Sequence, residues 1–169
     1  MWYILPFLVP GSLVYLGNGP AQLLAIYGSL PELALIALIY YGNSRGAMLG
    51  QLAGLAIGLT IDFLSAAPLG FFTFIFTLAG YAAGKSKGKI YVDPIFTPLL
   101  MIAVGILTKA LLVFILAGVF GYPEVRSAVF GSPFLIQLVY SLVLAPVVFA
   151  LLSLLDRVFP KKRRGGYQD

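Results

Sequence analysis

The sequence contains no cysteine and no histidine among its 169 residues. Disulfide bonds, thiol nucleophiles, zinc sites built from these side chains and histidine acid–base catalysis are therefore excluded. No P-loop, dinucleotide-binding fingerprint or calcium-binding loop is present either. Serine and threonine occur without the histidine that would activate a hydroxyl nucleophile. We therefore expect no metal, no cofactor and no catalytic group.

Charge is also scarce in this sequence. Only 10% of the residues are charged and 60% are hydrophobic, whereas a soluble domain carries about 25% charged residues. The mean hydropathy of +0.99 is that of a chain surrounded by lipid, because a bilayer removes the need to bury so much apolar surface. We predict an all-α integral membrane protein, with a single polytopic domain over residues 1–160 and a basic cytoplasmic tail over residues 161–169.

Apolar stretches separated by charges and by Gly or Pro breaks predict a compact bundle of six transmembrane helices, with five as the alternative. The first is expected to be an uncleaved span rather than a signal peptide. The second is expected to begin at Ser29, because Ser29, Pro31 and Glu32 fit a capping box. Residues 21–28 are expected to be a half-helix, and residues 121–133 a loop. The predicted spans are residues 2–17, 29–41, 46–64, 70–84, 95–120 and 134–158.

Lysine and arginine predict the orientation of the chain. Of the 11 such residues, Lys109 falls within a span and Arg126 falls outside, while the other nine fall inside if both termini are cytoplasmic. This asymmetry follows the positive-inside rule. Basic clusters beside apolar spans also favour contact with anionic lipid over nucleic acid. The nine predicted inner residues are Arg45, Lys85, Lys87, Lys89, Arg157, Lys161, Lys162, Arg163 and Arg164.

A glycine recurs every four residues along the third predicted span, at Gly46, Gly50, Gly54 and Gly58. Residues four apart share one face of a helix, so the series predicts a groove along that face. Without side chains there, another helix can approach backbone to backbone. We favour packing within the chain over a groove that receives the helix of a partner protein.

Three ionisable residues lie on the outer side of the predicted spans: Glu32, Asp62 and Lys109. Charges at such depth are costly, and they usually pair or line a cavity. We predict that Asp62 and Lys109 lie on facing helices and pair, which fixes the register of those helices. A polar binding site is the alternative. On the last span, Gln137 and Ser141 form a polar stripe that ordinary helix–helix hydrogen bonding explains.

Residues 31–89 contain an ordered set of features, of which a glycine-rich helix that ends in an acidic residue and a Leu-Gly turn is the most specific part. In order, the features are Pro31-Glu32 opening a short apolar helix, Arg45-Gly46 opening the glycine-rich helix, Asp62 ending it, the turn Pro68-Leu69-Gly70, and Tyr81, Gly84 and Lys85 closing the next helix. This order of features resembles the MreD family, bacterial membrane proteins of the rod-shape system.

This resemblance implies a non-enzymatic scaffold in the bacterial cytoplasmic membrane. Such proteins bind the bitopic partner MreC and are linked through it to the MreB filament and to the peptidoglycan polymerase–transpeptidase pair of lateral wall growth. The family is also similar to the six-helix substrate-binding subunits of energy-coupling-factor vitamin transporters. The alternative function is therefore a substrate-binding subunit of a small-molecule transporter, in which Glu32, Asp62 and Lys109 would line a ligand pocket.

Overall fold

The computed structural model describes residues 5–17, 29–65, 68–87, 96–129 and 131–158. The predicted half-helix over residues 21–28, together with Lys89 and the basic tail, lies outside the described residues. The all-helical architecture predicted from the sequence is confirmed. The helices are α1 (Leu5–Gly17), α2 (Leu33–Arg45), α3 (Ala47–Leu64), α4 (Phe71–Lys85), α5 (Phe96–Val119), α6 (Pro123–Ala128) and α7 (Ser132–Val158).

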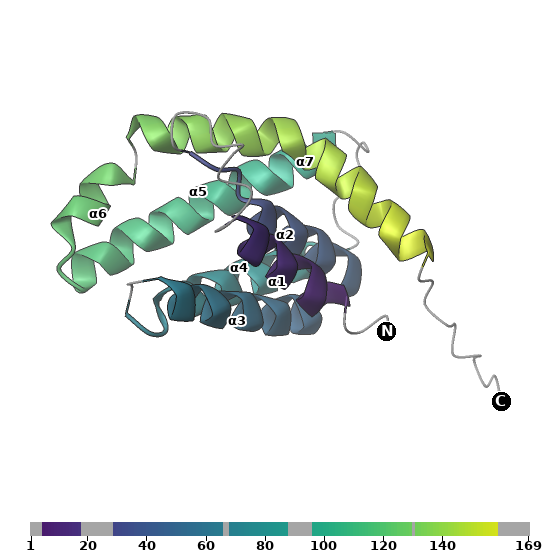
Figure 1. Cartoon of the computed structure of the whole chain (residues 1–169), viewed down its shortest axis with the longest axis horizontal. Helices are drawn as coiled ribbons and strands as arrows, with labels where there is room; N and C mark the ends of the chain where they lie inside the picture. Colours follow the sequence, from purple (N-terminus) through teal and green to yellow (C-terminus); the bar gives the residue numbers. More distant parts are fainter. Residues whose placement is uncertain (1–4, 18–28, 66–67, 88–95, 130, 159–169) are drawn as a thin grey trace.

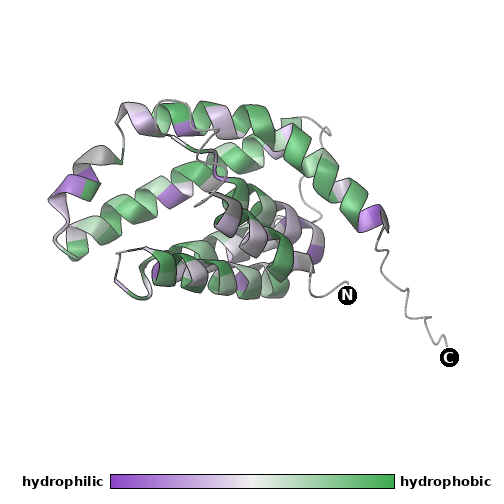
Figure 2. Cartoon of the chain, viewed as in Figure 1, coloured by the Kyte–Doolittle hydropathy of each residue, from purple (hydrophilic) through white to green (hydrophobic). Residues whose placement is uncertain are grey.

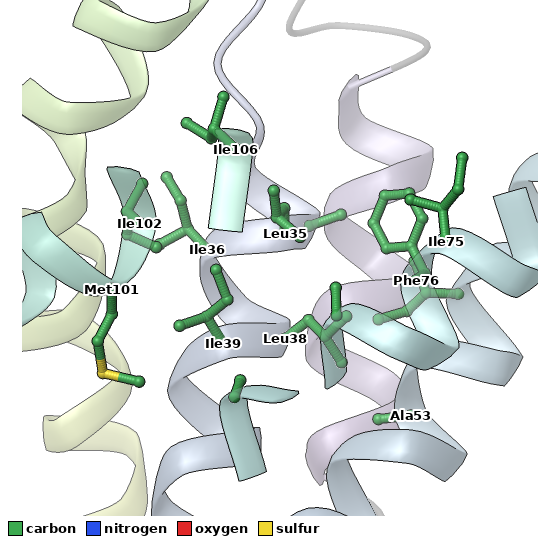
Figure 3. Packing of buried hydrophobic residues seen from close by; sticks show 14 of the residues in the cluster. Leu35, Ile36, Leu38, Ile39, Ala53, Ile75, Phe76, Met101, Ile102 and Ile106 are labelled. Carbon is green, nitrogen blue, oxygen red and sulfur yellow. The ribbon is translucent and has the colours of Figure 1, made fainter. Parts of the chain in front are cut away.

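Helix α2 is the centre of the bundle. All of its residues from Ala34 to Ile39 are buried, and it contacts α1, α3, α4, α5 and α7. A helix that is apolar on every side is stable only when neighbours surround it, and this one has them. Figure 3 shows side chains of α2 packed between those of α4 and those of α5. The labelled residues are Leu35, Ile36, Leu38, Ile39, Ala53, Ile75, Phe76, Met101, Ile102 and Ile106.

Helices α3 and α4 form an antiparallel hairpin and make the most extensive helix–helix contact in the described part of the chain. Figure 1 shows α5 and α7 running along one side of the group formed by α1 to α4, with α6 joining them at one end. Helix α7 bends part-way along its length. It contains Pro146, which removes a backbone hydrogen bond and accounts for such a bend.

Most of the surface of α5 and α7 is apolar, and Figure 2 shows both helices mainly in green, with a few purple and white turns. Exposed leucine and valine residues recur along them, among them Leu107, Leu111, Val139 and Val143. Three helices of the described residues are long and apolar enough to cross a membrane: α3, α5 and α7. The 13 residues of α1 and of α2 extend only about 20 Å each, less than the roughly 30 Å of a hydrocarbon core. The structure is that of a helical membrane protein, and the count of six spans stays a prediction.

The start of α2 differs from the prediction. The helix begins at Leu33, and its cap residue Glu32 makes no side-chain hydrogen bond to the backbone, so the predicted capping box is wrong. The Ser29 hydroxyl donates instead to the carbonyl of Pro133, at 3.2 Å. The N–H of Glu32 is satisfied from a distant helix, since it donates to Oγ of Ser141 at 3.0 Å. A tertiary contact therefore replaces the local cap.

Two other boundaries also differ. Helix α2 continues to Arg45 rather than ending near Tyr41, and α3 follows after the single residue Gly46. Gly46 has φ +101°, a conformation open to glycine and strained for other residues, so it allows this abrupt junction. The predicted loop over residues 121–133 contains the short helix α6, whose first residue is Pro123. Proline is well suited to the first turn of a helix.

Candidate functional site

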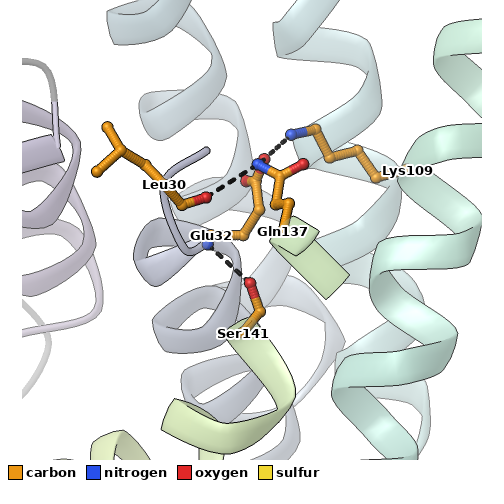
Figure 4. A network of polar contacts seen from close by, with 5 residues as sticks. All are labelled: Leu30, Glu32, Lys109, Gln137 and Ser141. Carbon is orange, nitrogen blue, oxygen red and sulfur yellow. Dashed lines mark hydrogen bonds and ion pairs between the residues drawn. The ribbon is translucent and has the colours of Figure 1, made fainter. Parts of the chain in front are cut away.

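A polar network joins the start of α2 to α5 and α7 (Figure 4). Glu32 and Lys109 form an ion pair through Oε1 and Nζ, and their side chains are 13% and 18% exposed. Nε2 of Gln137 donates to the same Glu32 oxygen at 2.8 Å and to the carbonyl of Leu30 at 3.2 Å. Ser141 completes the set through its bond to the N–H of Glu32. We call Glu32, Lys109, Gln137 and Ser141 the polar network.

Residue spacing explains how this network is built. Gln137 and Ser141 are four apart on α7, so both face the start of α2. Lys109 reaches Glu32 from α5. The predicted polar stripe on the last span thus makes helix–helix hydrogen bonds. The network has the composition of a register-fixing contact, because each charge has an opposite charge and the amide bridges two segments.

Asp62 does not belong to this network, and its predicted pairing with Lys109 is wrong. Its carboxylate accepts backbone hydrogen bonds from Gly70 at 2.9 Å, Phe72 at 2.8 Å and Thr73 at 3.1 Å. The Thr73 hydroxyl donates to it as well, at 2.6 Å. The side chain therefore caps the N-terminus of α4, where the helix dipole favours a negative charge. Local donors take the place of the distant ammonium group.

The predicted turn Pro68-Leu69-Gly70 lies between the two helices that Asp62 connects. The N–H of Phe71 donates to the carbonyl of Pro68 at 3.1 Å, which closes the turn. Gly70 adopts φ +96°, in the left-handed region that favours glycine. Leu69 is 71% exposed and contributes little to the core. Asp62 and the turn thus act as one unit that sets the α3–α4 hairpin.

The glycine groove of α3 is filled by α4. A Cβ atom added to Gly54 would overlap the carbonyl of Phe76, and one added to Gly58 would overlap the backbone of Thr73. Gly50 lies against Gly80 of α4 in the same way. The structure thus has the internal packing that we favoured, and the groove is not open to a partner helix. Gly46 differs from the rest of the series, because it forms the junction between α2 and α3.

A cavity of about 460 Å³ lies beside the polar network, between α5, α6, α7 and the segment before α2. Ser29, Lys109 and Gln137 give it a polar side, and its other walls are largely apolar. Such a mixture suits an amphipathic segment or molecule. The lining residues are Ser29, Leu30, Phe72, Ile106, Lys109, Ala110, Val113, Val125, Val129, Pro133, Phe134 and Gln137. Among the described residues, no group of three or more acidic side chains could hold a metal ion.

A second ion pair joins the C-terminal ends of α2 and α7, and the sequence analysis missed it. Arg45 pairs with Asp156, and the Tyr40 hydroxyl donates to the other oxygen of that carboxylate at 3.0 Å. The guanidinium of Arg45 also lies over the ring of Tyr41, 5.0 Å from its centroid. An acidic residue inside an otherwise apolar span was the available signal for Asp156.

The basic residues predicted to anchor the inner side divide into two groups. Lys85 and Lys87 are exposed, with Lys85 above the ring of Tyr81, as a contact with lipid head groups requires. Arg45 does not fit that prediction, because its side chain is only 1% exposed and is bound to Asp156. It is part of the interior of the bundle.

The sequence matches the family described as rod shape-determining protein MreD over residues 3–155, nearly the whole chain. The chain belongs to the MreD family. Membership makes it a bacterial membrane protein of rod-shape determination, and the resemblance seen over residues 31–89 is confirmed and extended. The most specific part of the MreD pattern is a glycine-rich helix that ends in an acidic residue and a Leu-Gly turn. The hairpin unit formed by Asp62 and the Leu69-Gly70 turn gives the structural reason for it. No curated protein and no solved structure shows a significant match.

Proposed function

We propose that this MreD-family protein is a non-enzymatic scaffold of the lateral cell-wall synthesis machinery. In this role it binds a bitopic MreC-like partner and, through that partner, is linked to the MreB filament and to the peptidoglycan polymerase–transpeptidase pair. The observation that carries the proposal is the family match over residues 3–155. The chain also has no cysteine or histidine with which to build the commoner catalytic sites.

The cavity beside the polar network is the best candidate for the partner contact. The glycine groove is occupied by α4, so it cannot accept another helix. The cavity, in contrast, combines apolar walls with the amide of Gln137 and the ammonium of Lys109. A partner segment with apolar side chains and a few polar groups would match it. The partly buried ion pair between Glu32 and Lys109 would keep the polar side of the cavity rigid.

A pair of tryptophan variants tests the contact. Val125 lines the cavity from α6 and is 44% exposed, so Val125→Trp should fill space without disturbing the core. Val143 lies on the outward face of α7 and is 68% exposed, so Val143→Trp is the matched control. We expect Val125→Trp alone to abolish co-purification of the bitopic partner and to leave depleted cells round. Normal partner binding by Val125→Trp would remove the cavity from the proposal.

The membrane topology forms part of the same proposal. We propose six spans in one domain over residues 1–160, similar to energy-coupling-factor substrate-binding subunits, with both termini in the cytoplasm and the tail over residues 161–169 against anionic lipid. The support is the distribution of lysine and arginine. A reporter that works only in the cytoplasm should be active when fused after Asp169. Activity of a periplasmic reporter at that position would contradict the topology.

Depletion of the protein separates the scaffold from the alternative transporter subunit. A scaffold requires loss of rod shape, whereas a transporter subunit requires loss of uptake of a small molecule with shape unchanged. The family match gives the transporter function no support. Unchanged rod shape after full depletion, together with a block in vitamin uptake, would overturn the scaffold.

A further inference from the structure

A groove of about 200 Å³ lies between α4 and α5. It is open because the side chains that face it are small: α4 contributes Ala79, Ala82 and Ala83. From the other helices, α5 contributes Gly105 and α2 contributes Ile39. We call this space the α4–α5 groove. Its lining residues on α5 lie on the face opposite to those of the cavity beside the polar network, so the two spaces are separate.

The groove is chemically apolar, although Ser86 and Thr108 line it. Each hydroxyl donates to a carbonyl of its own helix, that of Ser86 to Ala82 at 3.3 Å and that of Thr108 to Val104 at 2.7 Å. An occupant therefore meets apolar side chains and no hydroxyl hydrogen that is free to bond. One turn of an α-helix fills roughly 400 Å³, about twice the volume of the groove. A single acyl chain is thinner, and lipid tails are as apolar as leucine.

The length of the groove matches one leaflet of a bilayer. From Ala79 to Ser86, α4 rises about 10 Å, and half of a hydrocarbon core is about 15 Å thick. Ser86 is the C-cap residue of α4, so the groove reaches the end of that helix. It therefore runs from the level of the lipid head groups toward the middle of the bilayer, in the direction that an acyl chain follows.

Positive charge lies at the Ser86 end of the groove. The Lys87 side chain packs over Gly46, since a Cβ added to Gly46 would lie 3.9 Å from Nζ of Lys87. Gly46 follows Ile39 by about two helical turns, so it continues the face of α2 that lines the groove. Lys85 and Lys87 are both exposed, and neither pairs with a carboxylate among the described residues. An anionic head group would neutralise this charge.

We propose that the α4–α5 groove binds one acyl chain of an anionic phospholipid, whose phosphate lies beside Lys87. The apolar walls hold the chain, and the charge of Lys87 and Lys85 selects the head group. A neutral phospholipid supplies the same chain without the net negative charge, so the site discriminates between the two lipids. The inference stands apart from the proposed scaffold function, because it concerns a different face of α5 and no partner protein.

Fluorescence quenching by brominated phospholipids tests the site. The chain has a single tryptophan, so a Trp2→Phe background allows one reporter to be placed at will. Val104 lines the groove and is 54% exposed, and Val104→Trp is the reporter there. Val143 on α7 is 68% exposed, and Val143→Trp is the matched control. The purified full chain is placed in phosphatidylcholine vesicles that contain increasing fractions of phosphatidylglycerol, with one or the other lipid brominated.

We expect the Val104→Trp reporter to show about a tenfold preference for phosphatidylglycerol, as one or two nearby lysines would supply. The Val143→Trp reporter should show none. Equal preference at the two positions would overturn the proposal, because it would describe the whole lipid-facing surface. Weak quenching of Val104→Trp by both lipids would also overturn it, in favour of a protein segment that covers the groove.

Two changes in the Val104→Trp background separate the head group from the chain. Lys85→Gln together with Lys87→Gln should remove most of the preference and leave quenching by brominated phosphatidylcholine unchanged. Ala82→Leu fills the groove from an exposed position and should remove the preference while both lysines remain. Ala150→Leu, at an exposed position of α7, is its control. A preference that survives the paired lysine change, or that survives Ala82→Leu, would contradict a lipid bound in the groove.

Discussion

The carboxylate of Asp62, in the last turn of α3, accepts a hydrogen bond from the backbone N–H of Phe72, in the first turn of α4, at 2.8 Å. This bond crosses the turn between two antiparallel helices whose backbones are in contact along the glycine groove. The cap holds the start of α4 against the end of α3, so the glycines can remain in register with their α4 partners. The acidic residue, the turn and the glycine series therefore form one structural device.

Removing the cap should weaken the hairpin. In Asp62→Ala, three backbone N–H groups lose a buried charged acceptor, and hydrogen bonds to charged groups contribute about 1.5–3 kcal/mol. We expect the free energy of unfolding to fall by about 2–3 kcal/mol, and the melting temperature in detergent by about 5–10 °C. Thr73→Val removes only the side-chain donor and should cost less than half as much. Equal losses for the two variants would contradict a cap that acts through the backbone.

Helical periodicity made the contact between α3 and α4 predictable from the sequence. The partner of each charged residue could not be predicted in the same way. The spacing of Gly50, Gly54 and Gly58 is local information, and it correctly predicted a close helix contact. The partner of Lys109 depends on which helices face one another, and depth along a span does not give this. Asp62 lies within reach of α4 only because the turn brings the helix start back to it. The sequence predicts that Asp62 and Lys109 lie on the same side of the membrane. It does not show that Asp62 binds the start of α4 and that Lys109 binds Glu32.

The Arg45–Asp156 pair shows a second limit of the sequence. Charge counting treats every arginine at the end of a span as an anchor in the head-group region. Whether the side chain turns inward depends on a carboxylate more than 100 positions later. The positions of α3, α4, α5 and α7 were predicted to within a few residues, because long apolar runs determine them. Short segments such as α6 depend on tertiary contacts and were missed.

The closeness of α3 to α4 predicts a large effect from a single methyl group. In Gly54→Ala the new Cβ would overlap the carbonyl of Phe76, which cannot move without shifting the helix. Overpacking costs about 1–3 kcal/mol, and we expect the upper end of this range because backbone must give way. Gly11→Ala is the control, since a Cβ on Gly11 would meet nothing within 4 Å. Thermal unfolding in detergent should show a clear loss for Gly54→Ala and no loss for Gly11→Ala; similar melting of both would mean that α3 and α4 are not in backbone contact.

The polar network should show coupling between Glu32 and Lys109. Lys109→Met leaves the Glu32 carboxylate without its ammonium, and Glu32→Gln leaves the ammonium without its carboxylate. Because a lone charge in a largely buried site is costly, the double variant should be more stable than the sum of the single losses predicts, by about 1–3 kcal/mol. The same cycle with Asp62→Asn and Lys109→Met should give a coupling energy near zero. Strong coupling in that second cycle would restore the original pairing of Asp62 with Lys109.

The ion pair between Arg45 and Asp156 should respond unequally to loss of either member. The Arg45 side chain is 1% exposed, whereas that of Asp156 is 21% exposed. After Arg45→Met the carboxylate can recover hydration and keeps its bond from Tyr40, so the loss of stability should be about 1–2 kcal/mol. After Asp156→Leu the guanidinium remains buried without its carboxylate, and breaking a buried pair in this way costs about 3–5 kcal/mol. The melting temperature in detergent should therefore fall further for Asp156→Leu, and Arg45→Met added to it should recover part of the loss. A larger effect of Arg45→Met, or no recovery in the double variant, would show that the packing of Arg45 against Tyr41 outweighs its charge.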